Sequence, residues 1–453
     1  MPRIDPWKPR CLSVQNEAFN PPQIGEEHAE GQDAPVSQRP NSRFLVYSVA
    51  TCFVLSGAGS LVLEVVWSRH LKLLFGSTTL AISTILVTYM LGLGLGALAG
   101  GWISDRLRNG VRVYGLLEIG VGVYALAVPL LLQIIGALST TALTSGSFWP
   151  VTLARFAGSL GLMLLPTLAM GATLPVLVET LVADKRIMGE RVGLLYGINT
   201  AGAVIGVLLA TFLLFPRLGL AWSNRVGAGL DIAAGLIAAA LIAPRAVRTR
   251  EERRQHAKKK RTRPAAASNV TAPAWVLIGL VSYALVGFTA LVYEVTWTRT
   301  LSMVLGSSIY AFSAMLAAFL GGIALGSLAA RRWIDRMRDL WFAYAVSLGL
   351  LGLLALGTMT GFGRLPDAFL AIVRRGGLEG SSMITASFVL SSLVMIGPTL
   401  VLGWLFPLAS RAIAEAGEGV GWAVGATYFA NTIGSALGAF AGGFLLIPLI
   451  GVR

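Results

Sequence analysis

Long apolar stretches alternate with short polar segments along almost the whole chain. Eleven stretches reach the length of about 20 residues with which a helix crosses a hydrocarbon core of about 30 Å. They cover 44–66, 78–101, 113–136, 151–182, 190–215, 225–243, 274–296, 308–330, 340–361, 383–410 and 421–447. In lipid, backbone polar groups must be satisfied within the segment, and the ten-residue alternation of a transmembrane barrel is missing. The pattern therefore predicts an all-α polytopic membrane protein.

The apolar pattern occurs twice. Residues 55–106 return as 285–336 with 21 of 52 positions identical, and residues 166–219 return as 398–451 with 18 of 54 identical. A repeat of this length is far longer than the units of solenoid proteins, and it is typical of membrane proteins built from two homologous halves.

The halves differ in their number of spans. We assign residues 43–243 to a half of six helices and residues 274–453 to a half of five. The span 225–243 has no partner in the second copy. We therefore expect a chain that stops before a twelfth helix, and a natural protein of eleven helices is the alternative.

Composition and charge support a membrane location. Hydrophobic residues make up 55% of the chain and charged residues 13%, with a mean hydropathy of +0.72, whereas soluble domains carry about 25% charged residues. With the N-terminus inside, the inner segments hold 26 of the 36 basic residues, as the positive-inside rule requires. This predicts a cytoplasmic N-terminus and places Arg453 on the far side. The net charge of +14 mostly reflects this asymmetry, so we expect no nucleic-acid partner.

Two polar segments flank the first half. Residues 1–42 contain seven prolines and no apolar core of a signal peptide, so we expect a disordered cytoplasmic tail. Residues 244–273 hold ten basic and two acidic side chains and form a predicted cytoplasmic linker. This linker has two interpretations: it contacts anionic lipid head groups, or it is a solvated segment that only determines the topology. With only Cys11 and Cys52 as thiols, we expect no disulfide, metal or cofactor site.

The loop after the second span carries a recognisable motif. It reads GGWISDRLRNGVR over 100–112, and its counterpart reads ARRWIDRMRD over 330–339, so that Asp105-Arg106 matches Asp335-Arg336. The arrangement resembles the loop motif of the major facilitator superfamily, which implies a fold of two six-helix halves and a conformational latch at these four residues. The alternative is that they only cap helices and follow the positive-inside rule.

A narrower resemblance lies in the first and seventh spans, where LEVVWSR (63–69) matches YEVTWTR (293–299). This duplicated E-x-x-W-x-R motif resembles bacterial proteins described as fused major-facilitator and spermidine synthase proteins. The resemblance covers about 43–453 and implies a location in the bacterial cytoplasmic (inner) membrane. The sequence shows no strand pattern and no glycine-rich loop of an aminopropyltransferase domain, so we do not expect this chain to be an enzyme.

The duplicated carboxylates Glu64 and Glu294 are the first candidate site. A carboxylate within a span is costly, and Trp67 and Trp297 follow each one at the i, i+3 spacing that shares a helix face. One interpretation is a cation-attracting or proton-exchanging pair in a cavity between the halves. The other is an interfacial glutamate paired with arginine, beside a tryptophan of the aromatic belt.

Two further duplicated groups accompany these carboxylates. The fourth and tenth spans carry matched helix breakers, namely Pro166, Gly171, Pro175, Pro398, Gly403 and Pro407. Such breaks mark a transporter's binding site or merely kinked packing. The fifth and eleventh spans place a tyrosine and an asparagine on one face, namely Tyr196, Asn199, Tyr428 and Asn431. The asparagine amides have two possible roles, to bind substrate or to bridge neighbouring helices, and we favour bridging.

Arg155 and Asp231 are charged residues inside spans that are not duplicated. A lone charge within a membrane needs a partner, so we predict that these two form a buried ion pair.

Two functions of different class fit these features. The first is a transporter that moves a small cationic solute, such as a polyamine, by alternating access. The second is a membrane anchor or regulatory module for a spermidine synthase-like domain or partner protein.

Overall fold

The computed structural model describes residues 40–76, 79–104, 106–107, 109–144, 147–182, 185–242, 274–305, 308–361, 364–376, 380–416 and 419–450. By internal contacts the chain divides into Met1–Pro40 and Asn41–Arg453, and the helices belong to the second unit. The linker 244–273, most of the tail 1–42, and the residues Asp105 and Arg453 lie outside the described residues.

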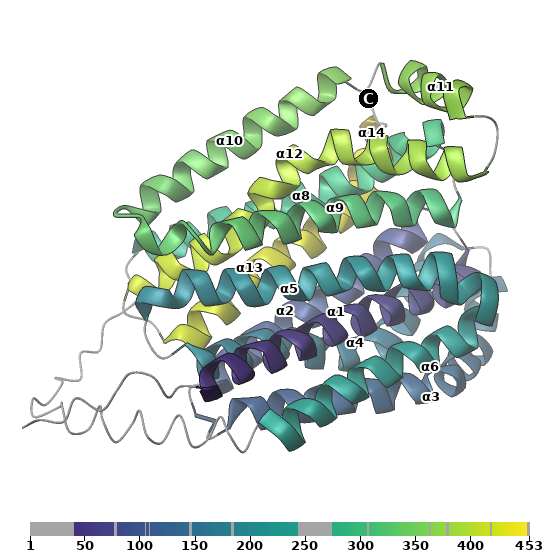
Figure 1. Ribbon diagram of the computed structural model, residues 1–453. Coiled ribbons are helices and arrows are strands. Elements are labelled where there is room, and N and C mark those ends of the chain that lie inside the picture. The colour runs from purple at the N-terminus through teal and green to yellow at the C-terminus, as the bar shows by residue number, and fades with distance from the viewer. Residues whose placement is uncertain are drawn as a thin grey trace, which may run out of the picture. The chain divides into compact units, whose positions relative to one another are not determined.

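The described residues are almost entirely helical (Figure 1). The first half consists of α1 (Pro40–Phe75), α2 (Thr79–Ser104), α3 (Gly110–Thr144), α4 (Phe148–Leu181), α5 (Met188–Leu208) and α6 (Phe215–Leu236). The second half consists of α8 (Ala274–Leu305), α9 (Ile309–Ala330), α10 (Leu340–Gly361), α11 (Leu365–Gly376), α12 (Gly380–Glu415), α13 (Val420–Phe440) and the short α14 (Ile447–Ile450). The expectation of an all-α polytopic protein is confirmed.

Ten helical segments of the described chain are long and apolar enough to span a membrane, and one of them, Lys185–Ala240, contains two predicted spans. Between α5 and α1, Gly202 meets Val54 and Gly206 meets Ala58. Between α6 and α1, Gly227 meets Leu63 and Asp231 meets Gly59. Residue numbers therefore rise together in α5 and α1 but run oppositely in α6 and α1. The chain reverses near Gly219, whose φ of 71° suits glycine.

The two halves repeat their internal contacts as well as their sequence. A Cβ on Gly92 of α2 would lie 1.8 Å from Thr167 Oγ1 of α4, and a Cβ on Gly322 of α9 would lie 1.8 Å from Thr399 Oγ1 of α12. These pairs are equivalent in the repeat. Small residues let the backbones of membrane helices approach closely, so the α2–α4 and α9–α12 pairs are built in the same way, and α9 and α12 lie side by side in Figure 1.

The predicted helix breaks do not interrupt their helices, which corrects the expectation from the sequence. Both α4, with Pro166, Gly171 and Pro175, and α12, with Pro398, Gly403 and Pro407, are continuous. Pro166 has no N–H to give to the carbonyl of Leu162, and the hydroxyl of Tyr124 donates to that carbonyl instead, at 2.9 Å. Neighbouring helices can satisfy backbone groups that proline frees, so proline alone did not predict a broken helix.

The second half contains a helix that the apolar pattern did not predict. The short α11 packs an apolar face, formed by Leu365, Ala368, Phe369 and Ile372, into the cluster around Trp297. Within the described part of this half, no helix covers α10 as α6 covers α3. Gly122 of α3 contacts Ala228 and Ile232, whereas a Cβ on its repeat equivalent Gly352 would meet no atom within 4 Å.

Candidate functional site: a cavity between the halves

A cavity of about 220 Å³ lies where the two halves meet. This volume far exceeds the roughly 10–15 Å³ that one water molecule needs. Six of the eight predicted substrate-binding residues line it, three from each half: Glu64, Tyr196, Asn199, Glu294, Tyr428 and Asn431. The structure therefore brings together residues up to 367 positions apart in the sequence, because α1, α5, α8 and α13 all face this space.

Glu64 and Glu294 are half-buried, and both line the cavity. They are close enough to interact electrostatically. Arg69 and Arg299, the interfacial partners considered above, are exposed and form no salt bridge with either glutamate in the described part of the chain. The geometry therefore favours a carboxylate pair that faces a shared cavity.

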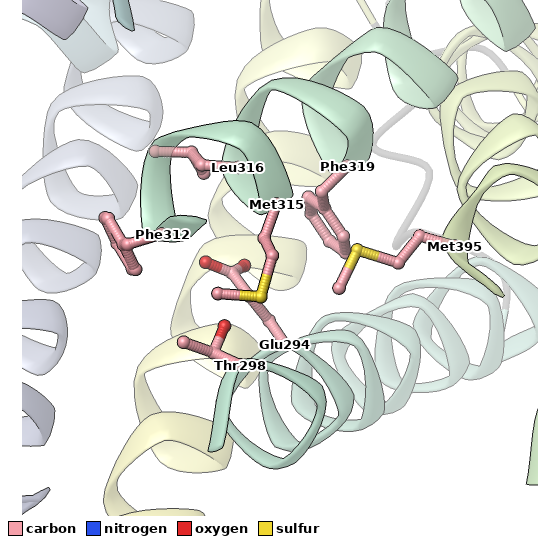
Figure 2. A pocket seen from close by; sticks show the side chains of 7 residues that line it. All are labelled: Glu294, Thr298, Phe312, Met315, Leu316, Phe319 and Met395. Carbon is pink, nitrogen blue, oxygen red and sulfur yellow. The ribbon is translucent and has the colours of Figure 1, made fainter. Parts of the chain in front are cut away.

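The two carboxylates have different surroundings. Tyr89 of α2 brings a hydroxyl to the cavity near Glu64, and Lys72 acts on this glutamate electrostatically. The repeat equivalent of Tyr89 is Phe319, which has no hydroxyl to offer Glu294. Figure 2 shows the Glu294 carboxylate among apolar side chains of α9. There, a side pocket of about 10 Å³ is lined by Glu294, Thr298, Phe312, Met315, Leu316, Phe319 and Met395. One glutamate thus has a polar partner and the other an apolar wall.

Trp67 and Trp297 do not line the cavity, and this corrects their assignment as substrate contacts. Trp67 is fully buried, and its indole N–H donates to Asn224 of α6 at 2.9 Å. Trp297 is 3% exposed and stacks on Tyr293 with the ring centroids 5.3 Å apart. Positions three residues apart differ by about 60° in direction around a helix, and here this difference turns the tryptophans from the cavity into the packing within each half.

Aromatic rings connect the halves beside the cavity. The ring of Phe406 of α12 lies 4.5 Å from that of Tyr196 and 5.8 Å from that of Tyr428, measured between centroids. Asn199 and Asn431 line the cavity, and their backbone carbonyls also receive the close approach of Gly57 and Gly287. The asparagines therefore occupy positions that serve both packing and the cavity.

Asp335 joins the halves at the end of the bundle where α5 begins, here called the Asp335 end. Its carboxylate accepts the backbone N–H groups of Gly189 at 3.0 Å and Glu190 at 2.7 Å, and it pairs with the Arg411 guanidinium. A carboxylate at a helix N-terminus satisfies free N–H groups and favours the helix dipole. Arg411 also donates to the carbonyl of Arg186 at 3.2 Å and pairs with Glu415.

The other predicted latch residues make fewer contacts. The guanidinium of Arg106 lies 4.1 Å from the ring centroid of Trp102, within its own half. Arg336 is exposed, and Asp105 is outside the described residues. In the equivalent place of the first half, Glu179 Oε2 accepts the backbone N–H of Gly421 at 3.0 Å. Glu179 is the repeat counterpart of Arg411, so the same position contacts the opposite half in both copies.

The predicted pair of Arg155 and Asp231 is not formed. Both carboxylate oxygens of Asp231 and the Nε of Arg155 are buried without a hydrogen-bond partner. The reason is the packing of the helices: α6 lies against α3 and α1, while α4 lies against α2 and α3. Complementary charge in two spans did not specify that the spans are neighbours.

Several residues of the site were missed from the sequence. A difference between the two copies of the repeat could have pointed to Tyr89, because the first copy has tyrosine at this position and the second has phenylalanine. Glu118 is a glutamate inside a predicted span, and it should have been noted with Asp231. Arg411 is one of the basic residues of the inner segments, and the charge on its repeat partner Glu179 is the feature that could have singled it out.

No family model matches the chain, and no curated protein matches it. Solved structures resemble it over most of its length. The human organic anion transporter MFSD10 (TETRAN) has a TM-score of 0.52 at 14% identity, over 91% of this chain and 96% of that chain. A bacterial homologue of the iron transporter ferroportin, in an outward-facing state, has a TM-score of 0.54 at 15% identity, over 88% and 92%.

The proton:xylose symporter XylE of the major facilitator superfamily has a TM-score of 0.51 at 13% identity, over 90% of each chain. At such low identity the likeness establishes the fold. The chain is a multi-pass, all-α protein with a major-facilitator-like fold, as its loop motif and repeat predicted.

Proposed function

We propose that the chain is a secondary transporter that moves a small organic cation, with polyamines as the first candidates, by alternating access of the central cavity. The observation that carries this proposal is that one cavity is lined by a carboxylate from each half. A charged group within a membrane protein is expensive unless it faces a cavity or a partner. Two carboxylates at one cavity favour a ligand with positive charge over a neutral or anionic one.

The polar contacts at the Asp335 end support a conformation in which this end is closed. They join the N-terminus of α5 in the first half to Asp335 and Arg411 in the second. In addition, the Lys185 ammonium donates to the carbonyl of Ala414 at 2.8 Å. With the orientation predicted from basic residues, this end is cytoplasmic, and Asp335 with Arg411 would act as the conformational latch. Breaking these contacts is then part of the change to the inward-facing form.

Uptake in proteoliposomes tests the proposal. Putrescine and spermidine are offered to the full chain, and Glu64→Gln and Glu294→Gln are compared with it. Glutamine keeps the size and hydrogen-bonding capacity of glutamate but holds no charge. We expect folded yield to stay nearly intact, uptake to fall at least about tenfold, corresponding to about 1.4 kcal/mol, and its pH dependence to change.

Asp367→Asn is the matched control, because Asp367 is exposed on α11 and does not line the cavity. Uptake that survives both cavity substitutions would contradict the assignment of the site. If neither cationic nor neutral solutes bind or move, the alternative of a membrane module for a spermidine synthase-like partner is favoured. Co-purification with such a partner, and loss of vesicle binding when the linker 244–273 is neutralised, would then be the next measurements.

A further inference from the structure

A second pair of carboxyl groups lies inside the first half, apart from the two cavity glutamates. Glu118 of α3 is 2% exposed and Asp231 of α6 is fully buried. Both converge on one face of α1. The Ser56 hydroxyl donates to Glu118 Oε1 at 2.8 Å, and Gly59, one turn further along α1, packs against the Asp231 carboxylate. A Cβ on Gly59 would lie 2.1 Å from Asp231 Oδ1, so the close approach requires glycine.

The pair has no basic partner among the described residues. The hydrogen-bond partner of Glu118 is the neutral Ser56 hydroxyl, and the salt bridges of the described residues, which Arg411 forms with Asp335 and Glu415, involve neither carboxyl. Asp231 has no hydrogen-bond partner on either oxygen. Two adjacent negative charges in such a place would be strongly unfavourable, so the site must hold positive charge or a proton.

The fold itself does not need this pair. The hydrogen bond of Tyr114 to the carbonyl of Cys52, at 3.3 Å, has a counterpart in the second half, where Tyr344 and Ser282 are 3.0 Å apart. In the same register, however, Ser56 corresponds to Val286, and Glu118 corresponds to Leu348. The second half packs the same helix contact with apolar side chains. The acidic pair is therefore an addition to the repeat and not part of its common structure.

Ser56 connects the pair to the central cavity. It is 6% exposed, lines the cavity, and donates its hydroxyl hydrogen to Glu118. A hydroxyl can give its proton to a carboxylate and take another from a cavity water, so that the number of protons on the serine does not change. Ser56 alone can therefore carry a proton between cavity water and the buried pair.

We propose that Glu118 and Asp231 form a proton-binding site, exchanging with the cavity through Ser56, and that this proton is the coupling ion of the transporter. The coupling role rests on the proposed function, whereas the proton site does not. In the protonated state the pair carries one negative charge or none and is compatible with its apolar surroundings. When the proton leaves, repulsion between the two carboxylates, one on α3 and one on α6, opposes the conformation described here.

Infrared difference spectroscopy of the full chain in lipid nanodiscs tests the proton site without any substrate. The background is Glu64→Gln with Glu294→Gln, which removes the cavity carboxyls. We expect a carboxylic-acid C=O band that shifts in D₂O and disappears as the pH rises. Glu118→Gln or Asp231→Asn should abolish this titrating band, and Glu415→Gln should leave it unchanged. Glu118→Leu, which copies the second half, is the alternative variant if the amide impairs folding.

The outcomes distinguish this inference from the proposed function. Absence of a titrating acid band, or a band that survives both substitutions, would overturn the proton site. Loss of the band on adding Na⁺ at constant pH would assign the site to a metal cation and would also overturn it.

The coupling role is tested by the ratio of putrescine uptake with and without an imposed pH gradient. This ratio should exceed one in the unaltered chain and fall to about one in Glu118→Gln, whatever the absolute rate. An unaltered chain that moves no solute would contradict the proposed function and the coupling role, while the infrared result would still decide the proton site.

Discussion

The Asp335 junction gives a sharp prediction because one arginine has two acidic partners of different kind. Arg411 pairs with Asp335 across the two halves and with Glu415 one turn away on its own helix. The Asp335 side chain is 18% exposed and that of Glu415 is 48% exposed. Asp335→Ala and Glu415→Ala therefore remove the same type of interaction from one guanidinium in two different settings.

The expected magnitudes differ severalfold. Removing one partner of a buried ion pair costs about 3–5 kcal/mol, and removal of Asp335 also leaves two N–H groups of α5 without an acceptor. Because Asp335 is partly exposed and Arg411 keeps Glu415, we expect about 2–3 kcal/mol for Asp335→Ala. An exposed pair is worth about 0.2–1 kcal/mol, so Glu415→Ala should cost no more than about 1 kcal/mol. Asp335→Asn keeps one acceptor oxygen and should lie between them.

Two assays measure this. Reversible unfolding in mixed micelles of increasing SDS fraction gives the free-energy differences. In addition, if the junction exists only in the conformation described here, a loss of about 2–3 kcal/mol shifts the equilibrium between conformations by about 30- to 150-fold. The labelling rate of Ser104→Cys, 1% exposed at the Asp335 end, should rise accordingly in a background without Cys11 and Cys52. Equal effects of Asp335→Ala and Glu415→Ala in both assays would refute the reasoning.

Two further predictions concern the cavity and the helix packing. Tyr89→Phe should weaken putrescine binding by about 2- to 10-fold, since it removes a hydroxyl from the cavity and a hydrogen bond contributes about 0.5–1.5 kcal/mol. Phenylalanine at the equivalent position 319 shows that the fold accepts this side chain. Unchanged binding in a scintillation assay would exclude Tyr89 from the site. Gly171→Ala should lower the free energy of unfolding by about 1–3 kcal/mol, because the added Cβ would lie 2.1 Å from the Leu93 carbonyl oxygen. Gly161→Ala is the control, since a Cβ at Gly161 meets nothing within 4 Å. This control should change the free energy of unfolding by less than about 0.5 kcal/mol.

The chemistry of single positions was only partly readable from the sequence. Glu64 and Glu294 were recognised because duplication marks them and because carboxylates are rare in spans. The tryptophans at the i, i+3 positions were placed in the wrong environment, since two side chains three residues apart can face different neighbours. The prolines of α4 and α12 suggested broken helices, but the Tyr124 hydroxyl satisfies the carbonyl that Pro166 leaves free.

The sequence by itself determined the spans, the two-half architecture and the superfamily-like fold. Apolar length and internal repetition are properties of segments along the chain, and the membrane forces such segments to be helices. Only the tertiary structure decided which polar residues meet. It separated Arg155 from Asp231, placed Asp231 beside Glu118, and brought Asp335 to Arg411 and the start of α5. The physical reason is that these contacts depend on which helices pack together and on how each is rotated, and no single span encodes either.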